Sequence, residues 1–343
     1  MTGQNRGVED LTGPADGVPR PGEGAAERAS GPVERSPVER ASGPAERASG
    51  PAESASGRDD GEPPVAVVTG ASSGIGLAAA EGLARRGWRL ALVGRDPGRL
   101  ESAMQQVRAL THAPVEAYRC DFARLAEVRE LAARLLTRYP RIDVLANNAG
   151  GVVPNRRSTV DGHEETIQTN HLAAFLLSHE LRPALRGGRI INTSSRAHQQ
   201  GRLNPDDLSS TRQRYVALVV YGSAKQANIA FTVEATKRWP EILSVSFHPG
   251  VVRTRFGSES ALYGWFYRYA PGLRTPEKGA ETLIWLATAD AAQLTPGGYY
   301  QDRRLRRPLP RIIDADFTAR LWEASLAAVR PSSTQPSAST DQS

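Results

Sequence analysis

The sequence is poor in cysteine, lysine and aromatic residues. It contains a single cysteine, Cys120, in 343 residues, and 6% of its residues are Phe, Trp or Tyr. One cysteine excludes an internal disulfide framework and is typical of a reducing compartment. No apolar run approaches the roughly 18 residues of a membrane span, and the N-terminus lacks the basic and then apolar pattern of a secretory signal. We therefore expect a soluble, cytoplasmic protein without a membrane span.

The basic residues are almost all arginine. The net charge is +6, and the lysines are only Lys225, Lys237 and Lys278. The densest basic run lies between Arg303 and Arg311, where Leu and Pro interrupt it. A nucleic-acid or anion patch is one interpretation of this run. We favour a solvated face, because the Arg excess extends along the chain together with abundant Ala and Gly, and we expect no nucleic-acid partner.

The two ends of the chain differ in composition from the middle. Residues 1–62 and 331–343 consist mainly of Pro, Gly, Ala, Ser, Glu and Arg. Such segments cannot bury enough apolar surface to offset the entropy of ordering. A seven-residue repeat occurs three times between Glu27 and Ala52, but its Gly-Pro pairs and its lack of apolar heptad positions exclude a coiled coil. We expect disordered tails, inert or partner-binding, around a single domain at 63–330.

From Val65 onwards, short apolar runs alternate with longer segments of helical period. This alternation indicates βαβ units and a parallel sheet. We expect strands at 65–69, 89–93, 115–119, 143–146, 189–193, 243–247 and 298–301. We expect helices at 74–86, 96–110, 125–138, 162–185, 219–238 and 275–288. The pattern predicts a doubly wound, Rossmann-like α/β sheet of about seven strands, with its ligand site at the carboxyl ends of the strands.

A glycine-rich turn follows the first expected strand. It reads Thr69-Gly70-Ala-Ser-Ser-Gly74-Ile-Gly76 and leads into an expected helix. Glycines let the backbone approach a pyrophosphate closely, and the helix N-terminus offers free N–H groups and a positive dipole. The spacing Gly-x-x-x-Gly-x-Gly differs from the usual Gly-x-Gly-x-x-Gly fingerprint. The strand–turn–helix context nevertheless predicts a dinucleotide site.

The end of the second expected strand indicates which nucleotide binds. An acidic residue there holds an adenosine 2′-hydroxyl, whereas an Arg accommodates a 2′-phosphate. Here the strand ends in Leu92-Val93-Gly94-Arg95. Gly94 leaves room where the carboxylate would stand and Arg95 can meet a phosphate, so we favour NADP(H). Asp96 could still serve a 2′-hydroxyl, which leaves NAD(H) as the alternative and Arg95 as an ordinary surface side chain.

Further motifs follow the glycine turn in a fixed order. They are Asp121, Asn147-Asn-Ala-Gly150, Asn170, Ser194-Ser195, Tyr221-x-x-x-Lys225 and Pro249-Gly250. With the turn, this set resembles the short-chain dehydrogenase/reductase family over about Pro64 to Arg330. Four runs are similar to the retinol-dehydrogenase-like branch of that family: Asn170-His-Leu, Ser194-Ser-Arg-Ala-His198, Ala227-Asn-Ile-Ala-Phe-Thr232 and His248-Pro-Gly-Val-Val-Arg-Thr254.

The resemblance implies that Tyr221 and Lys225 carry the chemistry. The two residues are four apart, so on a helix their side chains share one face. A phenol with a pKa of about 10 is a poor acid–base catalyst at neutral pH. A neighbouring ammonium and the positive ring of oxidised nicotinamide stabilise the phenolate. Tyr221 would then give a proton to the carbonyl oxygen as hydride reaches the carbon, and Lys225 would also hold the nicotinamide ribose hydroxyls.

The resemblance implies supporting roles for two more polar residues. Ser195 would hydrogen-bond the same substrate oxygen and fix its orientation, with the adjacent Ser194 as the alternative. Asn170 would hold a water in a proton relay from Lys225 to solvent, and its amide could also satisfy a neighbouring helix carbonyl.

Several cofactor contacts are implied by the resemblance more than by the residues themselves. Asn147 is expected near the adenosine ribose, Asn148 between the central strands, Asp121 at the adenine edge and Thr254 at the nicotinamide carboxamide. The complete set expected at the cofactor is Gly70, Ser72, Ser73, Gly74, Ile75, Gly76, Arg95, Asp121, Asn147, Ala149, Tyr221, Lys225, Pro249, Gly250, Val252 and Thr254. The six histidines show no metal-ligand spacing, so we expect no metal site.

Two segments are expected to shape the substrate end. One lies between Ser195 and Tyr221 and includes Leu203, Leu208 and Tyr215. The other follows Thr254 and is rich in aromatic and apolar residues: Phe256, Leu262, Tyr263, Trp265, Phe266, Tyr267 and Tyr269. The second segment is either a lid over a lipophilic substrate or an amphipathic helix packed on the body or on another subunit.

The sequence therefore predicts an NADP(H)-dependent oxidoreductase that acts on small hydrophobic carbonyl or alcohol compounds. One alternative is a carbon–carbon double-bond reductase of the same family, which uses the same Tyr and Lys. The other is a non-catalytic nucleotide-sensing or scaffold protein, against which the presence of both Tyr221 and Lys225 argues. By analogy with the family, the helices expected at 162–185 and 219–238 would form a dimer or tetramer interface.

Overall fold

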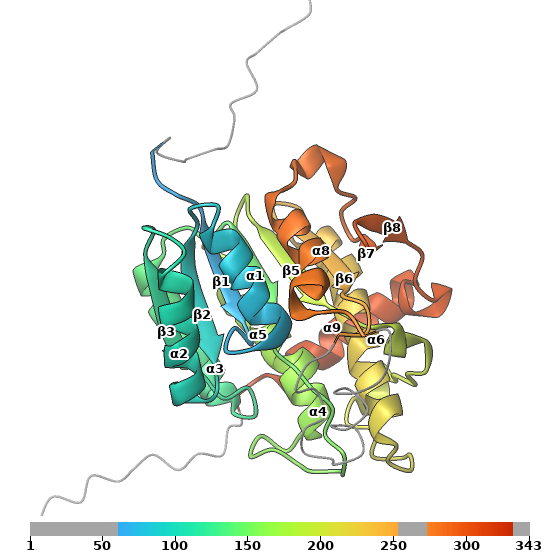
Figure 1. Ribbon diagram of the computed structural model, residues 1–343. Helices are drawn as coiled ribbons and strands as arrows, with labels where there is room; N and C mark the ends of the chain where they lie inside the picture. The colour runs from blue at the N-terminus through green and yellow to red at the C-terminus, as the bar shows by residue number, and fades with distance from the viewer. Residues whose placement is uncertain (1–60, 253–272, 332–343) are drawn as a thin grey trace, which may run out of the picture. The chain divides into compact units, whose positions relative to one another are not determined.

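The strands form where the apolar runs predict them. The computed structural model describes residues 61–252 and 273–331. Its sheet contains β1 (Val65–Thr69), β2 (Arg89–Gly94), β3 (Val115–Arg119), β4 (Val144–Asn147), β5 (Arg189–Thr193), β6 (Leu243–His248), β7 (Tyr299–Gln301) and β8 (Arg304–Arg306). The strand order is β3-β2-β1-β4-β5-β6-β7-β8 (Figure 1). Strands β1 to β7 are parallel, and only β8 pairs in the antiparallel sense.

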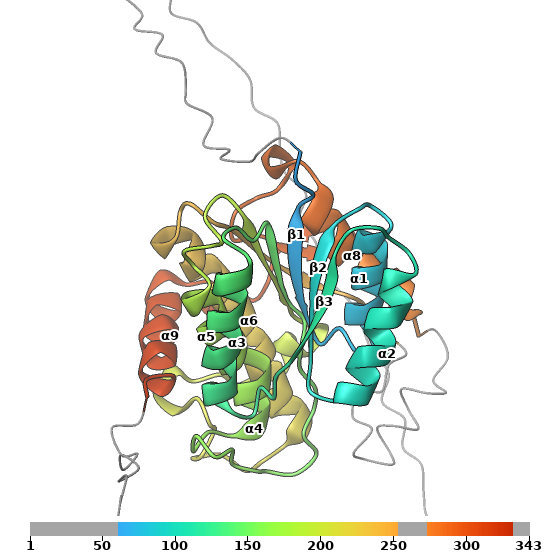
Figure 2. The ribbon, with the colours of Figure 1, turned by 90° about the vertical axis from the view of Figure 1, so that its left-hand side faces the viewer.

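Helices cover both faces of the sheet (Figure 2). One layer contains α1 (Gly74–Ala84), α2 (Pro97–Arg108) and α8 (Pro276–Thr288). The opposite layer contains α3 (Leu125–Arg138), α4 (Glu165–Ile167), α5 (Ala173–Glu180), α6 (Ala217–Arg238) and α9 (Ala315–Ala328). This is the predicted doubly wound architecture. No helix within the described ranges combines the length and the apolarity needed to cross a membrane.

The central strands are buried on both faces, as a parallel sheet requires. Every residue of β1 is buried. Val65 and Val67 pack into the core beneath α3, α5 and α6, whereas Ala66 and Val68 pack into the core beneath α1, α2 and α8. Side chains alternate between the faces of a strand, so a run of small and branched apolar residues serves both layers at once.

Two elements at the end of the chain are absent from the sequence prediction. Strand β8 has the sequence Arg-Leu-Arg and all three residues are exposed, so it offers no apolar run to detect. Helix α9 begins at a clear signal, because the Asp314 carboxylate accepts hydrogen bonds from the Asp316 and Phe317 N–H groups. It packs on α6 through Trp322, whose ring centroid lies 4.7 Å from that of Trp239.

The prediction of one long helix over residues 162–185 is wrong in detail. Gly162 has a φ of +82° and belongs to a tight turn that precedes the helix. Helix α4 begins after Glu164, whose carboxylate caps it. Residues Gln168–Leu172 form a π-helical turn between α4 and α5. There the Asn170 side-chain amide donates to the Thr166 carbonyl at 2.9 Å, and a side chain inserted into the backbone ladder distorts a helix in this way.

Helix α6 touches the segment that follows β5 at backbone distance. A 3-10 turn, Arg196–Gln199, follows β5 and leads to Gly201. A Cβ on Gly222 would lie 2.4 Å from the Ala197 carbonyl oxygen, and a Cβ on Gly201 would lie 2.5 Å from the Gly222 carbonyl carbon. Only glycine permits this approach. The close contact at Gly201 and Gly222 therefore sets the distance between the 3-10 turn and α6.

We expect Gly222→Ala to destabilise the protein by about 1–3 kcal/mol, because its methyl group would meet backbone atoms rather than a flexible side chain. Gly98→Ala is the matched control, since Gly98 is an exposed helical glycine whose added Cβ would have only an ordinary contact at 3.7 Å. This control should be neutral or stabilising by up to about 1 kcal/mol. Chemical denaturation of the three proteins measures both effects, and equal stabilities for the two variants would contradict the packing argument.

Candidate active site

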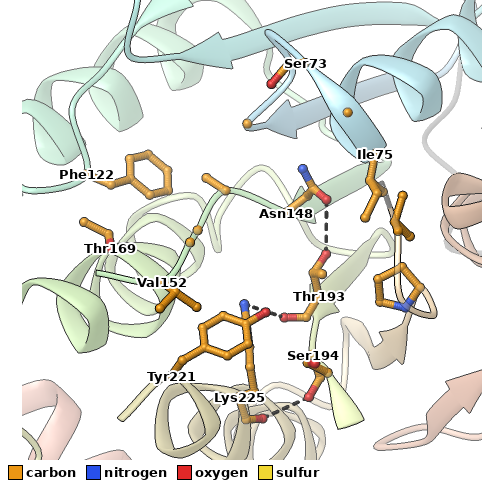
Figure 3. Close-up of a pocket in the computed structure, with 18 of the residues that line it drawn as sticks. Ser73, Ile75, Phe122, Asn148, Val152, Thr169, Thr193, Ser194, Tyr221 and Lys225 are labelled. Atoms are coloured by element: carbon orange, nitrogen blue, oxygen red, sulfur yellow. Dashed lines mark hydrogen bonds between the residues drawn. The ribbon is translucent and has the colours of Figure 1, made fainter. Parts of the chain in front are cut away.

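A cavity of about 680 Å³ lies at the carboxyl ends of the central strands. Strands β1 and β2 border one end, where the glycine turn and Arg95 line it. Strands β5 and β6 and helix α6 border the other end, where Ser195, Tyr221 and Lys225 line it. The site predicted at this edge of the sheet is thus a single continuous cavity (Figure 3).

The glycine turn is shaped to leave backbone N–H groups open to the cavity. Gly70 and Gly74 have φ values of +69° and +58°, which favour glycine. Ser73 at the start of α1 makes no side-chain cap, and the first turn of the helix holds no acidic residue. A Cβ on Gly76 would stand 2.3 Å from the Gly70 carbonyl oxygen. Gly76 therefore lies behind the turn and lets α1 begin there, and it does not line the cavity.

This geometry fits a dinucleotide pyrophosphate. Free N–H groups at a helix N-terminus and the helix dipole together attract phosphate. Side chains in place of Gly70 and Gly74 would prevent the loop backbone from approaching the pyrophosphate closely. Ser72, Ser73 and Ile75 line the same part of the cavity.

The end of β2 carries the residues predicted to select the nucleotide. Gly94, Arg95 and Asp96 all line the cavity. A Cβ on Gly94 would lie 3.3 Å from the Ser72 Cβ, so a larger side chain there would crowd the glycine turn. The Asp96 carboxylate accepts from the Arg99 N–H at 2.9 Å and pairs with the Arg99 guanidinium at 3.3 Å. Asp96 is thus occupied as the cap of α2, whereas Arg95 is exposed at the cavity wall.

The two adjacent asparagines at the end of β4 have the opposite placement to the prediction. Asn147 is buried, and its amide donates to Ser178 Oγ and to Asn192 Oδ1, both at 2.9 Å. Asn147 therefore braces the central strands and does not line the cavity. Asn148 lines the cavity, and its amide donates to the Thr69 carbonyl at 3.0 Å. The prediction that placed Asn147 near the ribose is wrong because the strand runs one residue further than expected, to Asn147.

Most of the other predicted cofactor residues line the cavity. Asp121, Ala149, Pro249, Gly250 and Val252 are among its walls. Thr254 and the aromatic residues 256–269 lie outside the described residues. The Cys120 thiol also borders the cavity, and burial raises its pKa to about 12, so it has no nucleophilic character.

Tyr221 and Lys225 project from one face of α6 into the cavity. Tyr221 is 7% exposed and Lys225 is 2% exposed. The Lys225 Nζ lies 5.2 Å from the centre of the Tyr221 ring and donates to the Thr193 carbonyl at 3.2 Å. Figure 3 shows the tyrosine hydroxyl and the lysine nitrogen directed toward the same space. Burial lowers the pKa of Lys225 to about 7.

The two adjacent serines after β5 have different surroundings. The Ser194 hydroxyl is buried and donates to the Lys225 carbonyl at 3.0 Å, so it ties β5 to α6 (Figure 3). The Ser195 hydroxyl accepts from the Ala197 N–H at 3.2 Å and remains able to donate. Because the Ser195 hydroxyl donates to no atom of the described residues, Ser195 is the better placed of the two to bond a substrate oxygen.

Asn170 lies in the π-helical turn behind the cavity. Its amide donates to the Gly151 and Thr166 carbonyls, both at 2.9 Å, so the helix-carbonyl contact considered from the sequence is present. Its Oδ1 is buried without a partner among the described residues. A Cβ on Gly150 would lie 2.2 Å from this oxygen and 3.5 Å from the Lys225 Nζ. The Asn170 Oδ1 and the Lys225 Nζ thus both lie on the side of Gly150 to which a Cβ would point.

Asn228 is a site residue that the sequence reasoning did not single out. Its amide donates to the Thr193 carbonyl at 3.0 Å and to the Asn170 carbonyl at 3.1 Å. Its Oδ1 lies 3.3 Å from Nδ1 of the fully buried His171, whose Nε2 lies 2.9 Å from Ser325 Oγ on α9. Burial lowers the pKa of His171 to about 4, so the imidazole is neutral. The sequence does contain an indication that Asn228 belongs to the site, because residues 221, 225 and 228 share one helical face.

Part of the expected substrate wall packs elsewhere. Leu203 is buried in a small core against α6, and Leu208 packs at the edge of that core, so neither lines the cavity. Tyr215 packs beside Tyr221, and its hydroxyl donates to the Val153 carbonyl at 2.7 Å. The prediction that Leu203, Leu208 and Tyr215 shape the cavity is therefore wrong, because none of the three lines it. Leu203 and Leu208 pack in the small core against α6, and Tyr215 packs in the cluster around Tyr221.

Comparison with known proteins identifies the class to which this fold and site belong. The sequence profile of the short chain dehydrogenase family matches residues 64–262. A Streptomyces sp. (strain C5) protein, provisionally named daunorubicin C-13 ketoreductase, is 54% identical over 263 residues, which cover 77% of this chain and 91% of the relative. Human retinol dehydrogenase 13 is 34% identical over 76% of this chain and 82% of its own length. The chain therefore belongs to the short-chain dehydrogenase/reductase family, and it is retinol-dehydrogenase-like.

Solved structures agree with this assignment. A Mycobacterium paratuberculosis protein of uncharacterised function has a TM-score of 0.64 and 30% identity, covering 79% of this chain and 96% of its own. A short-chain dehydrogenase from Sphingobium yanoikuyae in complex with NADPH has a TM-score of 0.54 and 26% identity, covering 65% and 84%. The predicted fold and family are confirmed, and the chain is an oxidoreductase of this family.

Proposed function

We propose that this protein is an NADP(H)-dependent enzyme that transfers hydride between the nicotinamide and the carbonyl or alcohol carbon of a small, largely apolar organic compound. The observation that carries the proposal is the pairing of Tyr221 with the buried Lys225 at one end of a cavity whose other end is a glycine cradle. A proton donor and an anion cradle in one cavity suit a dinucleotide-dependent reduction.

The nucleotide end favours NADP(H). Gly70, Gly74 and the open start of α1 would hold the pyrophosphate, and Arg95 would meet the 2′-phosphate. Asp96 is engaged by Arg99, which reduces its capacity to hold a 2′-hydroxyl. The solved relative from Sphingobium yanoikuyae is a complex with NADPH, which supports the same cofactor here.

Each polar residue at the catalytic end has a separate role in proton transfer or in positioning the substrate. The bound nicotinamide supplies the hydride for reduction and accepts it for oxidation. Tyr221 donates a proton to the substrate oxygen, and the Lys225 charge stabilises the phenolate that this leaves. Ser195 bonds the same oxygen and holds it against Tyr221. The Oδ1 of Asn170, which has no partner in the described part of the chain, holds a water that returns a proton toward Lys225.

The wall beside Tyr221 favours an apolar substrate body. Val152 and Ala217 pack on Tyr221, with Ala197 and Leu218 beside them. Val152, Ala197 and Leu218 line the cavity. Ligand pockets combine such apolar walls with a few polar groups that fix orientation. The 54% identical relative is named as a ketoreductase, which is consistent with a carbonyl substrate.

Tyr221→Phe tests the proposed acid–base role. Loss of the hydroxyl should lower kcat for NADPH-dependent reduction of a hydrophobic aldehyde by about 10²- to 10⁴-fold. The affinity for NADPH, followed by nucleotide fluorescence, should change little. Tyr215→Phe is the matched control, because it removes a hydroxyl in the same cluster whose hydrogen-bond partners among the described residues are Val153, Glu164 and Thr166. Activity of Tyr221→Phe within tenfold of wild type would rule out the role.

Arg95→Gln tests the cofactor preference. A charge-assisted contact to the 2′-phosphate contributes about 1.5–3 kcal/mol, so kcat/KM for NADPH should fall by about 10- to 100-fold while kcat/KM for NADH stays the same. Arg85→Gln, an exposed substitution at the far end of α1, should change neither value. A wild-type enzyme that prefers NADH would refute the assignment of Arg95 and keep the chemistry of Tyr221.

A further inference from the structure

The catalytic end of the cavity contains an arginine that the proposed chemistry does not use. Arg196 directly follows Ser195 and lines the cavity. It is exposed, and it makes no hydrogen bond or ion pair with any residue in the described ranges. A guanidinium presents five N–H donors in a planar fork that matches a carboxylate.

Arg196 lies far from the arginines of the nucleotide end. Arg95 and Arg99 stand at β2, and Arg99 is paired with Asp96. Arg196 follows β5, which is three strands from β2 in the sheet order. At about 4.8 Å between neighbouring strands, this separation is about 14 Å. Arg196 is therefore placed at the substrate and not at the adenosine phosphate.

His248 provides a second unsatisfied polar group at the same end. It is the last residue of β6, it lines the cavity, and it is 2% exposed. Val245 and Phe247 pack beneath α1 and α8, so strand alternation directs His248 to the opposite face, which α6 and Tyr221 cover. Its Nδ1 is buried without a partner among the described residues. A buried polar atom in that state requires a partner.

The charges around His248 are predominantly positive. Burial, together with the positive charges of Arg196 and Arg274, lowers the pKa of His248 to about 4. The imidazole is therefore neutral and can donate one hydrogen bond. Arg274 is engaged by the Asp302 carboxylate. Of the three carboxylates that line the cavity, Asp96 and Asp121 follow β2 and β3 at the nucleotide end, and Glu165 is held by Arg157 at 2.8 Å. Among the described residues, nothing at this end neutralises Arg196.

We propose that Arg196, with His248 beside it, binds a carboxylate carried by the substrate and so makes the enzyme selective for acidic carbonyl compounds. The inference rests on the proposed function, because it assigns a substrate class to the same site. The carboxylate accepts the two forked N–H groups of Arg196, and the N–H of His248 donates to it once the imidazole turns toward the cavity. The apolar body of the substrate contacts Val152 and Leu218, which line the same cavity, with its carbonyl between Ser195 and Tyr221.

A matched pair of substrates tests the proposal. The aldehydes 4-formylbenzoate and methyl 4-formylbenzoate share one scaffold and differ in charge. With saturating NADPH, wild type should reduce the acid with the higher kcat/KM. Arg196→Gln should lower the ratio of acid to ester by about 10- to 100-fold, mainly through KM, and Arg196→Lys should restore part of it. Arg202→Gln, an exposed arginine outside the cavity, should keep the wild-type ratio. An unchanged ratio in Arg196→Gln would overturn the proposal.

A binding measurement separates this proposal from the proposed function. Benzoate carries the carboxylate but no reducible carbonyl, so calorimetric titration of the NADP-saturated protein needs no turnover. Arg196→Gln should weaken benzoate binding at least tenfold relative to Arg202→Gln, and His248→Leu should weaken it about three- to tenfold. Equal benzoate affinity in wild type and Arg196→Gln would overturn the carboxylate site even if both aldehydes are reduced. Arg196-dependent benzoate binding without reduction of either aldehyde would contradict the proposed reaction alone.

Discussion

The structure of the catalytic end depends on how Lys225 is buried. An ammonium removed from water is costly unless a hydrogen-bonding group compensates it. Here that group is the Thr193 carbonyl at the end of β5, which accepts from Lys225 at 3.2 Å and from Asn228 at 3.0 Å. A carbonyl has two lone pairs and can serve both donors. The contact joins α6 to β5, and because compensation is partial, burial still lowers the pKa of Lys225 to about 7.

Close packing of small residues and buried polar contacts hold this arrangement in place. The glycine contact between Gly222 and Gly201 brings the turn after β5 onto α6 at backbone distance. In the π-helical turn at Gln168–Leu172, one oxygen of Asn170 has no hydrogen-bond partner within the described ranges. His171 joins the same turn to Asn228 and, through Ser325, to α9. A helix at the end of the chain thus supports side chains that lie at the carboxyl edge of the sheet.

The sequence predicts the parts of the molecule that depend on local pattern. The buried strands and the spacing of Tyr221 and Lys225 are local, because apolar runs and a four-residue step define them. Features that depend on tertiary contacts were not predictable in the same way. The observed positions of Asn147 and Asn148 are the reverse of the predicted ones. A strand that ends one residue later directs the other of two neighbouring side chains toward the cavity. The π-helical turn arises from a side chain that reaches the Thr166 carbonyl, and no periodicity records that contact.

Titration of the lysine side chains tests the central claim directly. The chain has only three lysines, so selective labelling of their Cε and Nζ atoms gives three NMR signals, with Lys237 and Lys278 as internal references. We expect one signal to titrate with a midpoint of about 7 and to disappear in Lys225→Met. Three midpoints close to the ordinary lysine value of about 10.4 would contradict it, because Lys225 would then not be held in a desolvated position.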